Sequence, residues 1–263
     1  MANWKVCESE VTGSEGLTPA PRQNRYMSQS DTKSAIVVGA SSGIGEALVR
    51  EFADHGYEVG LTARRREKLE EIGNQIDTQA YVARMDVTDL EDAREGFFEL
   101  ADAMGEVDVV VLCAGVGYEN RDLDWEKERE TIDVNVRGFT ALATAAMECV
   151  EAQGHGHLVG ISSVAAHMAN GALPAYPASK AFVSNYCDAL RYRAGTLDAD
   201  VTVTTIEPGF VDTDLAGGTF WMCSPETAAE QIYRAVRRKK RHAFVTRRWW
   251  LVSGLLGLLP DVV

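Results

Sequence analysis

The feature that most constrains the fold of this 263-residue chain is an alternation of two kinds of segment from Ser34 onward. Short β-rich apolar runs alternate with longer amphipathic stretches, and the runs cover residues 35–39, 58–62, 80–85, 107–115, 157–162, 201–207 and 242–246. Continuous apolar strands separated by helices favour a parallel sheet covered on both faces. Right-handed crossovers then predict an α/β, doubly wound (Rossmann-type) sheet of about seven strands, with ligands at the carboxyl ends of the strands.

The length suits one large domain, and no repeat or linker interrupts the alternation. We predict that this domain covers residues 33–246. Residues 1–32 are rich in Ser, Thr, Gln, Asn and Gly and are expected to form a flexible N-terminal tail, in which Met27 is an alternative start. Residues 247–263 form an apolar C-terminal segment.

The net charge of −13 and the pI near 4.9 argue against nucleic acid as a partner, because phosphate binding requires a basic face. The acidity fits either solubility alone or a high-salt cytoplasm. The five cysteines form no C-x-x-C pair, so neither a zinc site nor a disulfide framework is predicted, and a reducing cytoplasm is expected. His155 and His157 lack a third ligand nearby and are interpreted as a polar loop, so no metal site is expected.

The glycine-rich stretch GASSGIG directly follows the first predicted strand and opens the first predicted helix. Its glycines allow a tight turn and a close approach to a pyrophosphate, whose charge then faces a helix N-terminus. A glycine cluster alone is equally compatible with a simple tight turn, but this position is the one that a dinucleotide site requires. The residues assigned to the cofactor here are Gly39, Ser41, Ser42, Gly43, Ile44 and Gly45.

The end of the second predicted strand, LTARRRE, distinguishes between nicotinamide cofactors. NAD sites place a carboxylate about 20 residues beyond the glycines, whereas an arginine there suits the 2′-phosphate of NADP. Arg64 stands nineteen residues beyond Gly45, and no carboxylate ends the strand. Guanidinium groups bind phosphate in a bidentate manner, so we predict a clamp by Arg64 together with Arg65. NADP(H) is therefore preferred, with NAD(H) as the alternative.

A tyrosine and a lysine lie four residues apart in LPAYPASKAF, with a proline directly behind the tyrosine. Proline is tolerated in the first turn of a helix, which places Tyr176 at the helix start and Lys180 one turn further on the same face. A positive charge about 4 Å away is worth roughly 4 kcal/mol at an effective dielectric constant of 20. That energy corresponds to about three pKa units, which would bring the pKa of the phenol near neutrality.

Seven motifs together resemble the short-chain dehydrogenase/reductase family over roughly residues 34 to 215. They are GASSGIG, the Asp86-Val87 pair, C-A-G at 113–115, Asn135, the serine pair of ISSVA, Y-x-x-x-K and the PG of EPGFVDT. The resemblance implies an NAD(P)(H)-dependent oxidoreductase that acts on alcohols or carbonyl compounds, usually as a homodimer or homotetramer. Cys113 departs from the asparagine common there, and a changed local hydrogen bond with retained activity is expected.

By motif position, the resemblance implies that Asn135, Ser163, Tyr176 and Lys180 are catalytic. Ser163 is preferred over Ser162 because it precedes Tyr176 by the thirteen residues usual in the family. The implied cofactor contacts beyond the glycine turn and the arginines are Asp86, Val87, Ala114, Gly115, Tyr176, Lys180, Pro208, Gly209, Val211 and Thr213. Asn135 is placed inside a long predicted helix over 124–152, where it would hold a water that links the lysine to solvent.

These residues predict an NADP(H)-dependent oxidoreductase that interconverts a carbonyl compound and a secondary alcohol. Hydride transfer leaves charge on the carbonyl oxygen, to which Tyr176 can deliver a proton while Ser163 donates a hydrogen bond. The alternative is a non-catalytic nucleotide-sensing or interaction protein on the same fold. A pure binding protein would have no reason to keep the complete Asn-Ser-Tyr-Lys set.

Two regions bear on the substrate and on partners. Phe220, Trp221 and Met222 would form an apolar wall suited to a hydrophobic carbonyl compound, and His167 is a candidate for the edge of the pocket. Residues 237–259 join a basic cluster to tryptophans and leucines. This segment fits either peripheral contact with an anionic membrane or a last strand at 242–246, followed by leucines that pack on a second subunit.

Overall fold

The computed structural model describes residues 32–213, 222–246 and 248–249. Seven strands form one sheet in which every neighbouring pair is parallel, in the order β3-β2-β1-β4-β5-β6-β7. The strands are β1 Ser34–Val38, β2 Glu58–Ala63, β3 Ala80–Arg84, β4 Val109–Leu112, β5 His155–Ile161, β6 Asp200–Pro208 and β7 His242–Val245. The predicted doubly wound α/β sheet is confirmed.

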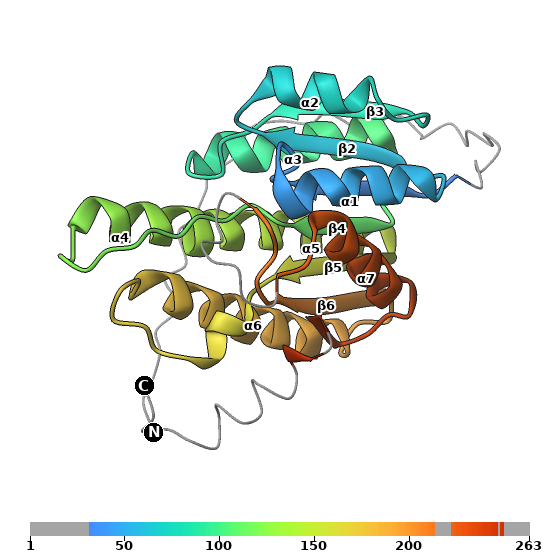
Figure 1. Cartoon of the computed structure of the whole chain (residues 1–263). Helices are drawn as coiled ribbons and strands as arrows, with labels where there is room; N and C mark the ends of the chain where they lie inside the picture. Colours follow the sequence, from blue (N-terminus) through green and yellow to red (C-terminus); the bar gives the residue numbers. More distant parts are fainter. Residues whose placement is uncertain (1–31, 214–221, 247, 250–263) are drawn as a thin grey trace, which may run out of the picture. The chain divides into compact units, whose positions relative to one another are not determined.

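Helices cover both faces of this sheet because both faces of its strands are apolar (Figure 1). The helices are α1 Gly43–Asp54, α2 Arg66–Gly73, α3 Leu90–Met104, α4 Trp125–Ile132, α5 Phe139–Gln153, α6 Ala175–Ala194 and α7 Pro225–Arg237. Side chains of α1, α2 and α7 form one core with one face, and side chains of α3, α5 and α6 form a second core with the other. Phe52 and Phe97 are fully buried in these two cores.

The order of the strands reverses at β1, which pairs with β2 on one side and with β4 on the other. Val38, the last residue of β1, is in register with Leu112, the last residue of β4. The segments that follow these two strands therefore leave the sheet side by side. This is the switch point at which doubly wound sheets bind ligands.

The prediction of one continuous helix over 124–152 is wrong in the middle of that range. A π-helix, Asp133–Gly138, separates α4 from α5. Wider π turns are found mostly as local interruptions of α-helices, often at functional sites. At this interruption, a Cβ on Gly138 would lie 3.0 Å from Cβ of Val87, so the helix packs against the segment after β3 as closely as a glycine permits. Periodicity alone does not reveal such a break.

The interpretation of His155 and His157 as a polar loop is also wrong, because both residues belong to β5. His157 is buried, and its Nε2 lies 2.7 Å from Oγ1 of Thr204 on β6. Burial, with the nearby Lys239 adding to it, lowers the pKa of His157 to about 4. The ring is thus a neutral hydrogen-bonding member of the core.

The alternative of a last strand at 242–246 agrees with β7, whereas the leucines that follow lie outside the described residues. In the part of the chain that the structure describes, no helix has the length and apolarity needed to cross a bilayer. Within the same residues, no group of three or more His, Cys, Asp or Glu side chains is arranged to hold a metal ion. Cys113, Cys149, Cys187 and Cys223 are free thiols.

Candidate active site

The glycine turn between β1 and α1 has the close backbone approaches that its sequence predicts. Gly39 has φ +86°, and a Cβ there would lie 2.6 Å from the backbone nitrogen of Ala114, at the end of β4. A Cβ on Gly45 would collide with the carbonyl oxygen of Gly39. The Ser42 side chain makes no capping hydrogen bond at the start of α1. The N–H groups of the first turn are therefore not occupied by that side chain, and they are oriented to receive an anion.

Both arginines after β2 lie beside this turn, but Arg65 makes the direct contact. Its guanidinium donates to Oγ of Ser41 at 3.0 Å and to the Ser41 carbonyl at 3.2 Å. Arg64 instead acts on Asp86 through its charge. Burial opposes ionisation of Asp86, but hydrogen bonds from Thr88 and the charges of Arg64 and Arg84 hold its pKa below the usual range. Three arginines, Arg64, Arg65 and Arg84, and the Asp86 carboxylate thus lie at the predicted adenosine side of the site.

Asn135, in the π-helix, is buried and fixes the chain that follows β4. Its Oδ1 accepts a 2.9 Å hydrogen bond from the Val116 N–H, and its Nδ2 donates to the Val116 carbonyl at 2.7 Å. Nδ2 also lies 2.9 Å from Oγ of Ser179 on α6. Because the Asn135 side chain is buried and makes these contacts, it does not lie on a solvated face of the helix. The amide ties the segment after β4 to α6, the helix that carries the tyrosine and the lysine.

Lys180 is buried beside the same segment. Its Nζ donates to the Ile161 carbonyl at 3.0 Å, and a Cβ on Gly115 would lie 3.1 Å from Nζ and 3.4 Å from Oδ1 of Asn135. Glycine at 115 therefore leaves room for the ammonium and the amide together. Burial lowers the pKa of Lys180 to about 8, and the Cys113 thiol only partly opposes that shift.

Tyr176 is the second residue of α6, as predicted, and Pro177 is the third. Its ring packs against the backbone at Gly117, where a Cβ would lie 2.6 Å from Cδ2 of the ring. Burial raises the pKa of the phenol above its ordinary value, and a hydrogen bond with the Ser163 hydroxyl partly opposes the rise. The expected fall of this pKa toward neutrality is thus wrong for the protein alone, because desolvation of the phenol is the largest effect on it and raises it.

The two adjacent serines differ in their surroundings. Ser162 donates to the Lys180 carbonyl at 2.7 Å and lies 2.7 Å from Oγ of Ser184, so both of its contacts are with α6. Ser163 caps the short 3₁₀-helix Val164–His167, accepting from the Ala165 N–H at 3.1 Å, and its hydroxyl reaches Tyr176. The geometry therefore favours Ser163 as the partner of the phenol.

The segment Pro208–Thr213 after β6 is anchored at several points. Its Gly209 packs so closely under the indole of Trp249 that a Cβ there would overlap the ring. Val211 forms an isolated bridge with Cys223. Thr213 reaches the glycine turn, where a Cβ on Gly43 would lie 2.9 Å from its Cγ2. The segment thus ends next to the N-terminus of α1, while the predicted wall residues Phe220 and Trp221 lie outside the described residues.

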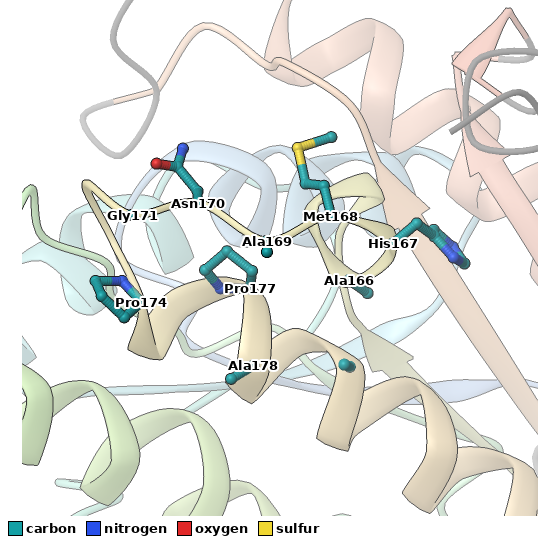
Figure 2. Close-up of a pocket in the computed structure, with 10 residues that line it drawn as sticks. Ala166, His167, Met168, Ala169, Asn170, Gly171, Pro174, Pro177 and Ala178 are labelled. Atoms are coloured by element: carbon teal, nitrogen blue, oxygen red, sulfur yellow. The ribbon is translucent and has the colours of Figure 1, made fainter. Parts of the chain in front are cut away.

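Two residues missed by sequence reasoning are prominent here. Trp249 is buried against Gly209, and Glu207 is 1% exposed at the end of β6. A lone carboxylate within the apolar run VTVTTIE was the available signal for Glu207. His167, predicted at the pocket edge, lies 2.6 Å from that carboxylate and lines a cavity of about 590 Å³ (Figure 2).

The comparisons with known proteins agree with this geometry. The family model described as short chain dehydrogenase matches residues 33–221. An uncharacterized oxidoreductase of Mycobacterium tuberculosis is 32% identical over 236 residues, which cover 85% of this chain and 91% of the relative.

Two solved structures are also similar. Serine dehydrogenase from Escherichia coli has a TM-score of 0.70 at 27% identity, with 81% of this chain and 99% of that chain covered. An alcohol dehydrogenase from Thermococcus sibiricus, complexed with 5-hydroxy-NADP, has a TM-score of 0.72 at 25% identity, with coverage of 81% and 96%.

Proposed function

Because the chain belongs to the short-chain dehydrogenase family of oxidoreductases, we propose that it interconverts a carbonyl compound and a secondary alcohol with NADP(H). One observation carries this proposal. Asn135, Ser163, Tyr176 and Lys180 come from three separate segments, namely the π-helix, the end of β5 and α6, and converge at the carboxyl edge of the sheet. A protein that only bound a nucleotide would not need a partly buried phenol, a buried amine and a hydroxyl donor together.

Each of the four residues has a distinct role in the proposed carbonyl reduction. A bound nicotinamide supplies the hydride. Tyr176, protonated because burial raises its pKa, delivers a proton to the carbonyl oxygen. Ser163 donates a hydrogen bond to that oxygen as charge develops on it. Lys180 supplies a positive charge near the phenol, and Asn135 holds the Val116 backbone in place beside it.

The residues around the switch point fit a dinucleotide. Side chains at Gly39 and Gly45 would clash with neighbouring backbone, so glycine at both positions permits the tight turn, and the α1 N-terminus offers N–H groups to phosphate. Asp86 and Val87, Ala114 and Gly115, and the segment Pro208–Thr213 border the same edge of the sheet. The arginines after β2 support a preference for NADP(H) over NAD(H). A further solved structure, a serine dehydrogenase complexed with NADP⁺ and 27% identical to this chain, supports the same preference.

The remaining elements of the proposal concern the cellular form of the protein. We propose a small-molecule substrate, a homodimer or homotetramer, and a cytoplasmic location. The basic C-terminal segment leaves peripheral membrane contact as an alternative to packing on a second subunit. Flotation with anionic liposomes, comparing the full chain with a version that ends at Thr246, separates these two.

The test of the proposed function is a panel of ketones and secondary alcohols, followed by NADPH absorbance at low and at high salt. Reduction of at least one ketone with NADPH, and slower reduction with NADH, is expected. Tight NADPH binding without turnover of any compound, at either salt concentration, would favour the nucleotide-sensing alternative.

A further inference from the structure

A buried carboxylate with two imidazoles lies at the carboxyl edge of the sheet, outside the residues used so far. Oε2 of Glu207 lies 2.6 Å from Nε2 of His167, and Oε1 lies 3.2 Å from Nε2 of His242 on β7. Oε1 also accepts a 2.8 Å hydrogen bond from Ser184 on α6. Burying a carboxylate is costly, and here a hydroxyl and two rings compensate for that cost. We refer to Glu207, His167 and His242 as the Glu207 cluster.

The ionised state of Glu207 determines which ring nitrogen of His167 carries the proton. Burial opposes ionisation, but the hydrogen bonds from His242, His167 and Ser184 hold the pKa of Glu207 below its ordinary value. A carboxylate can only accept, so Nε2 of His167 must carry the proton that it donates. In the neutral ring, Nδ1 is then a lone-pair acceptor. Nδ1 is the ring nitrogen left for a ligand.

His167 lies at one end of the cavity of about 590 Å³, between the segment after β5 and the start of α6 (Figure 2). The other lining side chains are apolar or small except for Asn170, and they include Met168, Pro174 and Pro177. In Figure 2 the imidazole stands apart from these residues, at the opposite end from Asn170 and Pro174.

The cavity is built by the same two elements that carry the proposed acid and its hydrogen-bonding partner. Ser163 caps the 3₁₀-helix that contains Ala166 and His167. Tyr176 lies on α6 between Pro174 and Pro177. The cavity lining therefore includes Pro174 and Pro177, which stand on either side of Tyr176 at the start of α6, and residues of the 3₁₀-helix that Ser163 caps.

On the premise of the proposed function, we propose that His167 is a specificity-determining residue whose Nδ1 accepts a hydrogen bond from a substrate hydroxyl. The preferred substrate is then a ketone with an apolar carbon chain and a hydroxyl group away from the reacting carbon. An anionic group is disfavoured at this end of the cavity, because the ionised Glu207 carboxylate is negatively charged. Adding a proton to one imidazole would neutralise that charge without making this end positive. Among the described residues no metal arrangement competes for these imidazoles.

The test measures kcat/KM with NADPH for 2-alkanones of four to eight carbons, each matched with its terminally hydroxylated and its terminally carboxylated counterpart. We expect the wild-type protein to prefer the hydroxylated ketone over the plain one by about tenfold, the upper end of the net effect of one hydrogen bond. His167→Gln keeps a donor toward Glu207 and removes Nδ1, so the ratio should fall to about one, mainly through KM.

Two further variants keep the result interpretable. Glu207→Gln removes the charge that fixes the Nε2–H tautomer and should also lower the ratio. His242→Gln changes the same cluster away from the cavity and should leave the ratio unchanged. Melting temperatures establish that each variant is folded.

The outcomes separate the two proposals. Reduction of plain and hydroxylated ketones at equal rates, a preference for the carboxylated series, or an unchanged ratio in folded His167→Gln and Glu207→Gln would each overturn the role of His167 and leave the reductase intact. Absence of turnover with every ketone would overturn the proposed function and this inference with it.

Discussion

Nζ of Lys180 lies 5.8 Å from the ring centre of Tyr176, and burial moves the pKa values of these two groups in opposite directions. The phenol becomes a weaker acid and stays protonated, whereas the ammonium, with a pKa of about 8, becomes easier to deprotonate. In the protein without ligands, the lysine is therefore the group of the pair that titrates near neutral pH.

This difference predicts the alkaline limb of the pH profile. The kcat/KM for NADPH-dependent reduction should fall as the pH rises through about 8, because Lys180 then loses the charge that supports Tyr176. Lys180→Arg, which stays charged, should move this limb to higher pH in whatever activity remains. A limb that stays near pH 8 in the variant would assign the titration to another group.

Tyr176→Phe removes the proton donor and keeps the ring that packs against Gly117. We expect reduction to fall by a factor of about 10² to 10⁴, the usual contribution of a general acid, while NADPH binding changes little. Turnover and NADPH titration by fluorescence measure the two effects. Wild-type turnover in the folded variant would remove Tyr176 from the mechanism.

Cofactor selectivity should depend on both arginines after β2. Arg64→Asp should shift the preference toward NADH, and Arg65→Ala should weaken NADPH binding more than NADH binding, because the Arg65 guanidinium, which lies at Ser41, would bind a 2′-phosphate that NADH does not have. Arg66→Ala is the matched control, since that side chain pairs with Glu70 on the surface of α2. The readout is the kcat/KM for NADPH divided by the kcat/KM for NADH. A wild-type value of this ratio in all three variants would contradict the clamp.

The contact between Gly209 and Trp249 can be tested by rescue. Gly209→Ala should weaken NADPH binding, because the added methyl group has no room beneath the indole. Adding Trp249→Ala should restore part of the binding, which a merely structural loss at either site would not do. Trp125→Ala, at an exposed tryptophan, is the control. Additive losses in the double variant would show that the indole does not position the segment.

His157 predicts how stability depends on pH. Its pKa in the folded protein, about 4, is below its ordinary value of 6.5, so its contribution is complete above pH 6.5 and is lost as the pH falls toward 4. The loss amounts to about 3 kcal/mol. His157→Gln keeps a donor for Thr204 and should flatten this part of the curve, measured by urea unfolding at several pH values. His55→Gln, at an exposed ring, serves as the control and should reproduce the wild-type slope.

The seven strands could be predicted from the sequence because continuous apolar runs between helices report burial on both faces of a sheet. The glycine turn and the start of α6 could also be predicted, since Gly39 and Pro177 mark local backbone requirements. The π-helix at Asn135 could not, because it coincides with a tertiary contact between Gly138 and Val87 that hydrophobic periodicity does not report. The direction of the Tyr176 pKa was missed because desolvation depends on the whole surrounding core.

Trp249 has a consequence for how the protein is made. The indole that holds Gly209 in place is added to the chain about forty residues after the glycine itself. A nascent polypeptide therefore lacks this contact until β7 and the residues after it, through Trp249, have been synthesised. We expect a chain stalled before Trp249 to form most of the sheet and to bind the coenzyme weakly.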